Sequence, residues 1–435
     1  MGRSKKKDPA KQASVAGRRF LLWAAYLSVA ILWACGDSSG PTDLDPVLTP
    51  TTMTAVEGLA LQAPAGTILP EGPTVEVRDQ NGSPMPGLSV SFQVLEGGGT
   101  VPVASRSTDT RGRSRIPWIL GRDAGTTQRL RASAGSLSVV FEASAIEGVP
   151  GESYLGRAGY TEYLPGEMPL VVSAPHGGEL RPEEIPDRTW GTTVHERNTL
   201  DLAMRIRSAV KAKTGFYPFV ILSQLHRVKL DPNREIEEAA QENPEAERAW
   251  WEFQTYIVEA EAIVEETYGE GLYVDLHGHG HDIQRLELGY LLSSSDLRNT
   301  NEALSAPSYV NKSSFRVLGQ KPGVNFAELI RGPTSLGTLF EAQGFPAVPS
   351  LSQPNPGEAD PFLSGGYNTG RHGSRDEGSV SGVQIECNYT GVRDTDANRQ
   401  AFAEGLAEVL SSFYPVYFER ELTGSIAQGA AVRHH

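Results

Sequence analysis

Apolar positions along this chain follow one period before residue 147 and another after residue 152. Between residues 53 and 146, short runs such as 74–78 and 88–94 alternate apolar and polar residues, with turn-forming glycine, asparagine and aspartate between them. A period of two indicates strands with one buried face, and short strands at this spacing predict an antiparallel β-sandwich. No cluster of residues that would support catalysis stands out in this stretch.

Beyond a hinge rich in glycine and proline, strand patterns alternate with helical patterns. The apolar runs at 171–175 and 272–276 predict buried strands, and Asn243-Pro244 predicts the start of a long helix. Further patterns predict strands at 219–222, 288–292 and 383–386, and helices at 199–212 and 396–413. Strands that alternate with helices predict an α/β layer fold over residues 153–424.

The beginning of the chain follows neither pattern. Residues 1–34 combine a basic start with an uncharged run of fifteen residues, which is too short to span a membrane and typical of a signal peptide. The run ends in Leu-Trp-Ala-Cys, which resembles the bacterial lipoprotein cleavage box and implies a lipid on Cys35. Residues 35–52 predict a flexible tether. Because no aspartate follows the cysteine, an outer-membrane address is favoured. The alternative to a lipoprotein is an uncleaved anchor or a stray buried cysteine.

Charge and cysteine content limit the function and the sources of stability. The net charge is −14, and removal of the basic segment 1–34 makes the chain more acidic still. Nucleic-acid phosphates require a basic surface, so nucleic-acid binding is excluded. With Cys35 acylated, Cys387 has no partner for an intrachain disulfide. The exported protein would therefore depend on its hydrophobic cores, with bound metal as an additional source of stability.

Residues with metal-ligand chemistry follow two of the predicted buried strands. His176 and Glu179 come after the strand at 171–175, and His277 comes directly after the strand at 272–276. Ligand sites in open α/β sheets lie at the carboxyl ends of strands, so we expect these three side chains to meet. Two imidazoles and one carboxylate leave one zinc position open, as in catalytic sites. The donors suit one zinc ion, although another divalent metal remains an alternative.

Neighbouring residues leave alternatives open. The stretch 277–281 contains three histidines and needs to supply one ligand, so the others are either outer partners or an exposed tract. Asp275 either orients a ligand or merely ends its strand. His195 and Glu196 are expected to begin a helix and to have no chemical role.

Five short pieces in joint order resemble the zinc carboxypeptidase superfamily, and more closely its N-formylglutamate amidohydrolase branch. The pieces are His176 to Glu179, His226-Arg227, Asp231-Pro232-Asn233-Arg234, His277, and Gln384 to Asn388. The resemblance covers roughly residues 165–415. It implies a carboxypeptidase-like (phosphorylase/hydrolase-like) α/β fold with one zinc ion held by His176, Glu179 and His277.

The same resemblance implies roles for the remaining pieces. Asn233 and Arg234, within an Asp-x-Asn-Arg element, would bind a substrate carboxylate, and Arg227 would polarise the scissile carbonyl. Glu386 would act as general base, and burial of its carboxylate in an apolar strand is costly unless something uses it. Ordinary surface pairing is the alternative for both arginines.

A loop at 365–373 resembles the family's loop before the strand that carries the base. Its Tyr367 and Arg371 would line the substrate pocket. Motif matches in loops are weak signals, so their alternative is a role without substrate contact.

The stretch 53–146 resembles bacterial immunoglobulin-like domains of the invasin and intimin type. The matching parts are residues 77–82, 108–112 and 141–143. The resemblance covers roughly a fifth of the chain. It implies an immunoglobulin-like sandwich at this position.

The sequence thus predicts a multidomain, lipid-anchored protein of the bacterial cell envelope, facing the periplasm or the cell surface. An all-β immunoglobulin-like sandwich would precede a zinc amidohydrolase that cleaves an amide bond in an N-acyl amino acid or peptide-like substrate with a carboxylate. The family's enzyme works inside the cell on histidine breakdown, whereas this chain has an export pattern, so the substrate stays open. The alternatives are an adhesion protein with a non-catalytic hydrolase-like receptor domain and a zinc deacetylase that acts on sugars.

Overall fold

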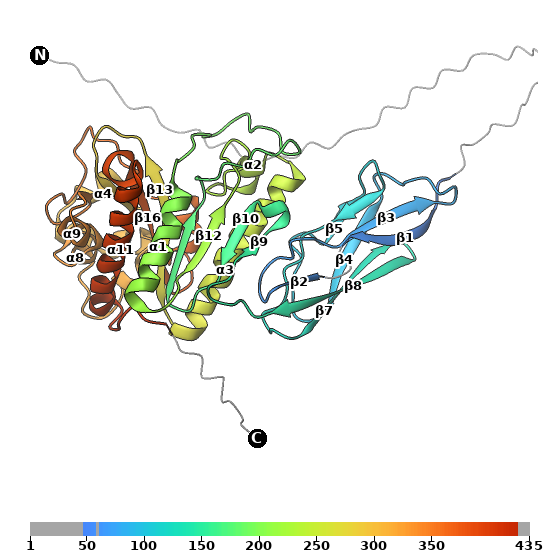
Figure 1. Ribbon diagram of the computed structural model, residues 1–435, viewed down its shortest axis with the longest axis horizontal. Helices are drawn as coiled ribbons and strands as arrows, with labels where there is room; N and C mark the ends of the chain where they lie inside the picture. The colour runs from blue at the N-terminus through green and yellow to red at the C-terminus, as the bar shows by residue number, and fades with distance from the viewer. Residues whose placement is uncertain (1–46, 58–60, 425–435) are drawn as a thin grey trace, which may run out of the picture. The chain divides into compact units, whose positions relative to one another are not determined.

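The computed structural model describes residues 47–57 and 61–424 (Figure 1). Cys35 and the predicted signal peptide lie outside the described residues, as does the tether up to residue 46. Within the described part of the chain, no helix has the length and apolar character needed to cross a membrane.

Residues 50–146 form two sheets with strand orders β1-β3-β6 and β2-β8-β7-β4-β5. The strands are β1 (Pro50–Glu57), β2 (Leu61–Pro64), β3 (Thr74–Asp79), β4 (Ser89–Glu96), β5 (Ser105–Ser107), β6 (Arg113–Arg115), β7 (Thr127–Ala134) and β8 (Leu137–Ile146). The predicted alternation is visible in β7, where Leu130, Ala132 and Ala134 are buried while every second residue faces outward. Pairing is antiparallel except between β2 and β8, which are parallel.

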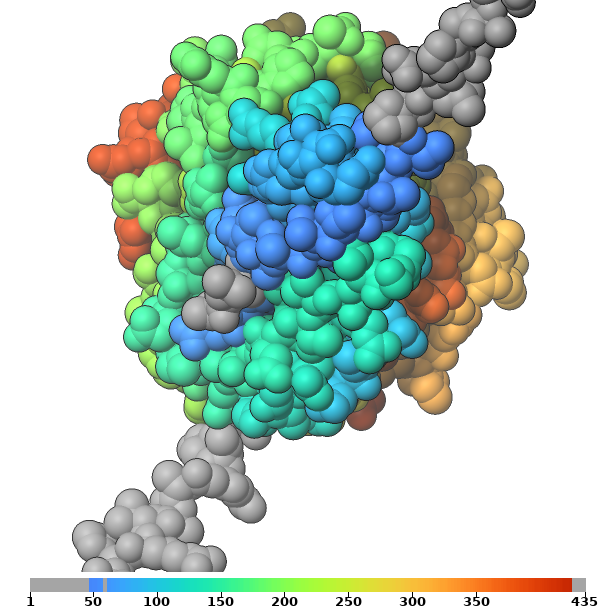
Figure 2. Space-filling model, turned by 90° about the vertical axis from the view of Figure 1, so that its right-hand side faces the viewer, coloured from blue at the N-terminus to red at the C-terminus, as the bar shows by residue number. Residues whose placement is uncertain are grey.

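The two ends of this β region lie next to each other. β2, near its start, pairs with β8, at its end, and Figure 2 shows the blue and teal surfaces of these parts of the chain side by side. The apolar core between the sheets includes the fully buried Trp118. The predicted β-sandwich is therefore present.

The second region contains an eight-stranded sheet in the order β15-β14-β16-β13-β11-β12-β10-β9. The strands are β9 (Tyr154–Leu155), β10 (Thr161–Leu164), β11 (Leu170–Ala174), β12 (Phe219–Ser223), β13 (Gly271–His279), β14 (Leu286–Gly289), β15 (Ala347–Val348) and β16 (Val380–Asn388). The central strands β12, β11, β13 and β16 are parallel, whereas β14 and β10 run antiparallel to their central neighbours. The carboxyl ends of the central strands therefore meet at one edge.

Helices cover both faces of this sheet (Figure 1). They are α1 (Thr199–Thr214), α2 (Ile236–Ala240), α3 (Pro244–Tyr268), α4 (Ser294–Leu297), α5 (Asn301–Leu304), α6 (Pro307–Lys312), α7 (Arg316–Gly319), α8 (Phe326–Arg331), α9 (Leu336–Ala342), α10 (Tyr367–His372) and α11 (Asp396–Tyr417), with short turns at Arg157–Gly159 and Tyr389–Arg393. Val172 of β11 packs with α1 and α11, while its neighbour Val171 packs with α3. Asn243 caps α3 as predicted, since its side chain accepts from the backbone N–H groups of Glu245 and Ala246.

Two predicted strands have different ends. The strand predicted at 272–276 continues to His279, so His277 lies inside β13 rather than after it. The strand predicted at 288–292 begins at Leu286 and ends at Gly289. Leu291 has a φ of 63°, which is incompatible with a continuing strand.

Candidate metal centre

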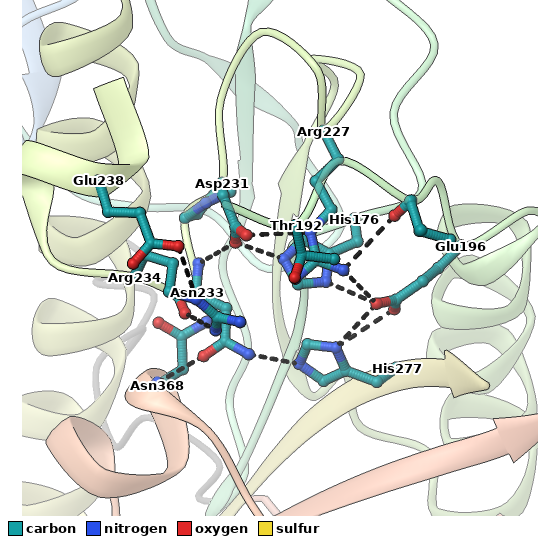
Figure 3. Close-up of polar contacts among 12 residues, drawn as sticks. His176, Thr192, Glu196, Arg227, Asp231, Asn233, Arg234, Glu238, His277 and Asn368 are labelled. Carbon is teal, nitrogen blue, oxygen red and sulfur yellow. Dashed lines mark hydrogen bonds and ion pairs between the residues drawn. The ribbon is translucent and has the colours of Figure 1, made fainter. Parts of the chain in front are cut away.

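Two histidines and a glutamate form a buried group at the carboxyl edge of the parallel strands (Figure 3). His176 follows β11, His277 lies near the end of β13, and Glu196 lies in the segment before α1. Nδ1 of His176 is 2.8 Å from Oε1 of Glu196, and Nδ1 of His277 is 3.2 Å from its Oε2. One ligand atom from each residue falls within 4.8 Å of the others. The predicted meeting of His176 and His277 is therefore observed.

Each imidazole is held from the opposite side by a buried aspartate. Nε2 of His176 is 2.7 Å from Oδ1 of Asp231, and Nε2 of His277 is 2.8 Å from Oδ2 of Asp275. A carboxylate on one ring nitrogen fixes the N–H there and leaves the lone pair on the other nitrogen. The inner nitrogen of each ring, Nδ1, then points toward Glu196 and offers its lone pair to a metal when the imidazole is neutral. This is the arrangement that metal-binding histidines have in proteins.

Arg227 joins the carboxylates of this group. Its Nε donates to Oδ2 of Asp231 at 3.0 Å, and its second nitrogen donates to Oε1 of Glu196 at 3.1 Å. The backbone N–H of Gly278 donates to the other oxygen of Glu196 at 3.0 Å. Arg227 therefore lies at the cluster as predicted, but its guanidinium is engaged with carboxylates. Its action on a substrate carbonyl stays a prediction.

The charges of the cluster depend strongly on one another. Burial works against the ionised form of Glu196, but the imidazoles of His176 and His277 outweigh it and hold the pKa of Glu196 well below its usual value. Burial likewise opposes the charged form of His277, yet Asp275 and Glu196 raise its pKa well above the ordinary range. The negative charge concentrated here is thus balanced by protons on imidazole. A divalent cation would balance it in the same way with both imidazoles neutral.

The structure does not bring Glu179, the expected carboxylate ligand, into the cluster. Its side chain is 77% exposed, and its Oε1 lies 3.5 Å from Nε2 of His195. Residues 177–179 form neither a helix nor a strand, and Leu180 forms a parallel bridge with Leu225. Residues three apart share a side in a helix, and without a helix here His176 and Glu179 point to different places.

Glu196, to which the sequence assigned no chemical role, supplies the buried carboxylate instead. Its backbone N–H donates to the carbonyl of His176 at 3.1 Å, which returns the segment to the sheet edge. The helix begins only at Thr199, so Glu196 is not part of it. One signal in the sequence could have identified Glu196 as a site residue. It is an acidic residue in the last loop segment before a helix that packs on the sheet.

The Asp-x-Asn-Arg element is placed at the site, but its first residues serve the cluster itself. Asp231 orients His176 and contacts Arg227, as described above. Asn233 is buried, and its Oδ1 accepts from the backbone N–H of Asn368 at 2.8 Å while its Nδ2 lies 3.4 Å from Nε2 of His277. Asn233 thus connects the cluster to α10, and its binding of a substrate carboxylate stays a prediction.

Arg234 is more available than Asn233. Its side chain is 32% exposed, and its Nε lies 3.3 Å from Oε1 of Glu238. Figure 3 shows this pair beside the cluster. Nη1 of Arg234 also donates to the backbone carbonyl of Asn233 at 2.6 Å. A guanidinium whose charged partner is partly exposed can exchange that partner for a ligand carboxylate.

Tyr367 and Arg371 lie on α10, whose first turn approaches Asn233 closely. A Cβ added to Gly366 would lie 2.6 Å from Nδ2 of Asn233, so glycine permits this approach. Arg371 donates to the hydroxyl of Tyr367 at 3.2 Å and lies 5.7 Å above the ring of Trp250. The structure therefore places Tyr367 next to the site and leaves Arg371 exposed one turn further along.

Glu386 lies in β16, the strand next to that of His277. It lies opposite His277 in the register of β13 and β16. Gln384 donates to its Oε1 at 2.8 Å, whereas its Oε2 is buried and has no hydrogen-bond partner among the described residues. Burial raises the pKa of Glu386 to about 8, and the negative charges of Glu196 and Glu287 act in the same direction. Its role as general base stays a prediction.

Comparisons with known proteins found solved structures that are similar to part of this chain. No family model matches the chain, and no curated protein matches it significantly. Among solved structures, an intimin fragment in complex with the translocated intimin receptor is 21% identical with a TM-score of 0.17, covering 23% of this chain and 32% of its own. Invasin, a bacterial integrin-binding protein, is 20% identical with a TM-score of 0.19, and the match covers 28% of this chain and 23% of invasin. Domains 4 and 5 of the S-layer protein SbsC are 17% identical with a TM-score of 0.19, and the match covers 23% of this chain and 53% of that structure.

These matches cover 23% to 28% of this chain, and the chain spans between 23% and 53% of the length of those structures. The chain is multidomain: a β region that matches immunoglobulin-like domains of bacterial proteins precedes a mixed α/β region with a largely parallel sheet.

Proposed function

We propose that this chain is a metal-dependent amidohydrolase with a carboxypeptidase-like α/β domain. The observation that carries the proposal is the pair of imidazoles whose outer nitrogens contact Asp231 and Asp275 while their inner nitrogens converge on Glu196. This donor set provides two nitrogens and one carboxylate, which leaves a position for water or substrate. His176, Glu196 and His277 would hold the ion.

A zinc ion held there would acidify a bound water and polarise a carbonyl group. Glu386 would take the proton from the water and pass it to the leaving nitrogen, because its Oε2 has no other partner among the described residues. A carboxyl beside a divalent cation ionises more easily, so the raised pKa of Glu386 does not prevent this role. Gln384 would fix the carboxyl orientation through the other oxygen.

The substrate would carry a carboxylate close to the scissile amide. Arg234 is the partly exposed cation beside the cluster and would bind that carboxylate in place of Glu238. Tyr367 and Arg371 of α10 would line the side of the pocket near Trp250. N-acyl amino acids and short peptides have this combination of groups.

The protein would act in the bacterial cell envelope. The proposal rests on the signal-peptide pattern and on Cys35 as the lipidated residue. The immunoglobulin-like sandwich would hold the hydrolase at a distance from the membrane, and the lipid would be its membrane contact.

The test combines metal analysis with a substrate panel. The purified protein should contain a divalent metal and hydrolyse at least one N-acyl amino acid or dipeptide, and a chelator should abolish this activity. The variant Glu386→Gln should retain the metal and lose turnover. Retained activity in this variant would exclude Glu386 as the base, and a metal-free protein that is fully active would exclude the whole proposal.

A further inference from the structure

A second group of metal-ligand side chains lies on the same strand as the first. His279 near the end of β13, His281 just after it and Glu287 in β14 have ligand atoms within 4.8 Å of one another. His279 and Glu287 are buried, and His281 is partly exposed. The proposed hydrolase site uses His277 of this stretch and leaves these three residues without a function.

Each buried donor of this group is held from outside, as in the first cluster. Nε2 of His279 donates to the carbonyl of Arg285 at 2.8 Å, and Oε2 of Glu287 accepts from the backbone N–H of Leu363 at 2.7 Å. A backbone carbonyl on one ring nitrogen leaves the lone pair on the other, so Nδ1 of His279 is the available donor atom. Oε1 of Glu287 is likewise the oxygen that faces inward.

The inner atoms already face one another. Nδ1 of His281 lies 2.8 Å from Oε1 of Glu287, and the rings of His279 and His281 are 4.8 Å apart. Nδ1 of His279 accepts from the backbone N–H of His281 at 3.1 Å. Loss of this neutral hydrogen bond on ion binding is small compared with the free energy of a metal site.

The register of the sheet places this group beside the proposed zinc site. His277 and His279 are two residues apart in β13, so their side chains leave the same face of the sheet. Glu386 of β16 lies opposite His277 on one side and opposite Glu287 on the other. The Glu386 carboxyl therefore lies between the two groups of metal-ligand side chains. Its Oε2 has no hydrogen-bond partner among the described residues.

We propose that His279, His281 and Glu287 bind a second divalent transition-metal ion, with Glu386 between the two ions. Two imidazole nitrogens and one carboxylate suit Zn²⁺. The partial exposure of His281 gives solvent ions access to the site. This inference goes beyond the proposed function, because the first site can exist without the second.

The experiment counts zinc ions per chain. The protein is stripped with a chelator, reloaded with Zn²⁺, dialysed and analysed by mass spectrometry of the metal. All versions carry His434→Asn and His435→Asn, because the chain ends in two histidines that could bind zinc themselves. We expect two ions per chain in this background, one in His281→Ala, one in His176→Ala and none in the double variant.

The outcomes separate the two sites. Equal zinc content with and without His281→Ala overturns the second site, and His281 and Glu287 are then an ordinary ion pair. Equal content with and without His176→Ala overturns the first site but not the second. Glu287→Gln, which keeps the side-chain shape, should give the same loss as His281→Ala. It replaces that variant if thermal unfolding shows that His281→Ala does not fold.

Discussion

Oε1 of Glu196 lies 2.8 Å from Nδ1 of His176, although the two residues are 20 positions apart in the sequence. The contact forms because the chain between them leaves the sheet edge and returns to it, where the backbone N–H of Glu196 bonds to the carbonyl of His176. Glu196 then contacts both imidazoles, while Glu179 remains in solvent. A loop therefore decides which of the two carboxylates meets the histidines.

This relationship predicts opposite results for two glutamates. Glu196→Gln should weaken zinc binding by at least about a hundredfold, because a charged ligand becomes a neutral amide. Glu179→Gln is the matched control and should leave the affinity unchanged. Competition with a chromophoric chelator measures both values. Strong weakening by Glu179→Gln with no effect of Glu196→Gln would show that the metal uses the other carboxylate.

The aspartate behind His277 should tune the site without binding the ion. Asp275→Asn removes the charge that orients the imidazole, and we expect metal affinity to fall by roughly ten- to a hundredfold. Asp187→Asn is a suitable control, since Asp187 pairs with Lys229 at the surface. The same chelator competition tests this prediction. Equal affinities for the two variants would contradict the orienting role.

Metal affinity should depend on pH through His277. Burial opposes its charge, but Asp275 and Glu196 raise the pKa of the metal-free imidazole well above its usual value. Zinc must displace that proton, so affinity should be highest above this pKa and should fall as the pH is lowered through it. Zinc titrations from pH 6 to pH 9 would show the fall together with proton release. An affinity independent of pH over this range would contradict it.

The metal-free protein should be stabilised by removing the charge of Glu386. In the unfolded chain this carboxyl ionises near 4.5, whereas burial raises its pKa to about 8 in the folded protein. Between these values the folded state keeps a proton that the unfolded state has lost, so stability falls as the pH rises from 4.5 to 8.

Glu386→Gln removes this dependence. With chelator present, we expect the variant to exceed the original protein in unfolding free energy at pH 8 by on the order of a few kcal/mol, and to equal it near pH 4. Urea unfolding at several pH values gives the comparison. A constant difference across the whole range would assign the effect to packing rather than to ionisation.

The sequence predicted the parts of the fold that depend on local pattern. The period of two identified the sandwich strands, and the buried runs before His176 and near His277 identified β11 and β13. These patterns indicate which face of a segment is buried, and that depends largely on the order of apolar and polar residues within the segment itself. The meeting of the two histidines followed from the rule that carboxyl ends of parallel strands share one edge.

The outer parts of the site could not be predicted in this way. Asp231 was given no role of its own within the Asp-x-Asn-Arg element, yet the loop places it against His176. The alternatives for Asp275 could be separated only with the register of β11 and β13, which sets Ser173 opposite Asp275 and allows its hydroxyl to hold the carboxylate at 2.6 Å. Such contacts depend on tertiary geometry that no local spacing encodes.

His176 follows β11 and His277 lies in the neighbouring strand β13, yet about a hundred residues of chain separate them. An ion shared by the two would act as a reversible cross-link that closes this long loop and reduces the entropy of the unfolded chain. Cys387 is the free cysteine of the described part of the chain and is buried. The supply of metal would thus set the lifetime of the folded protein, and sequestering zinc would shorten that lifetime.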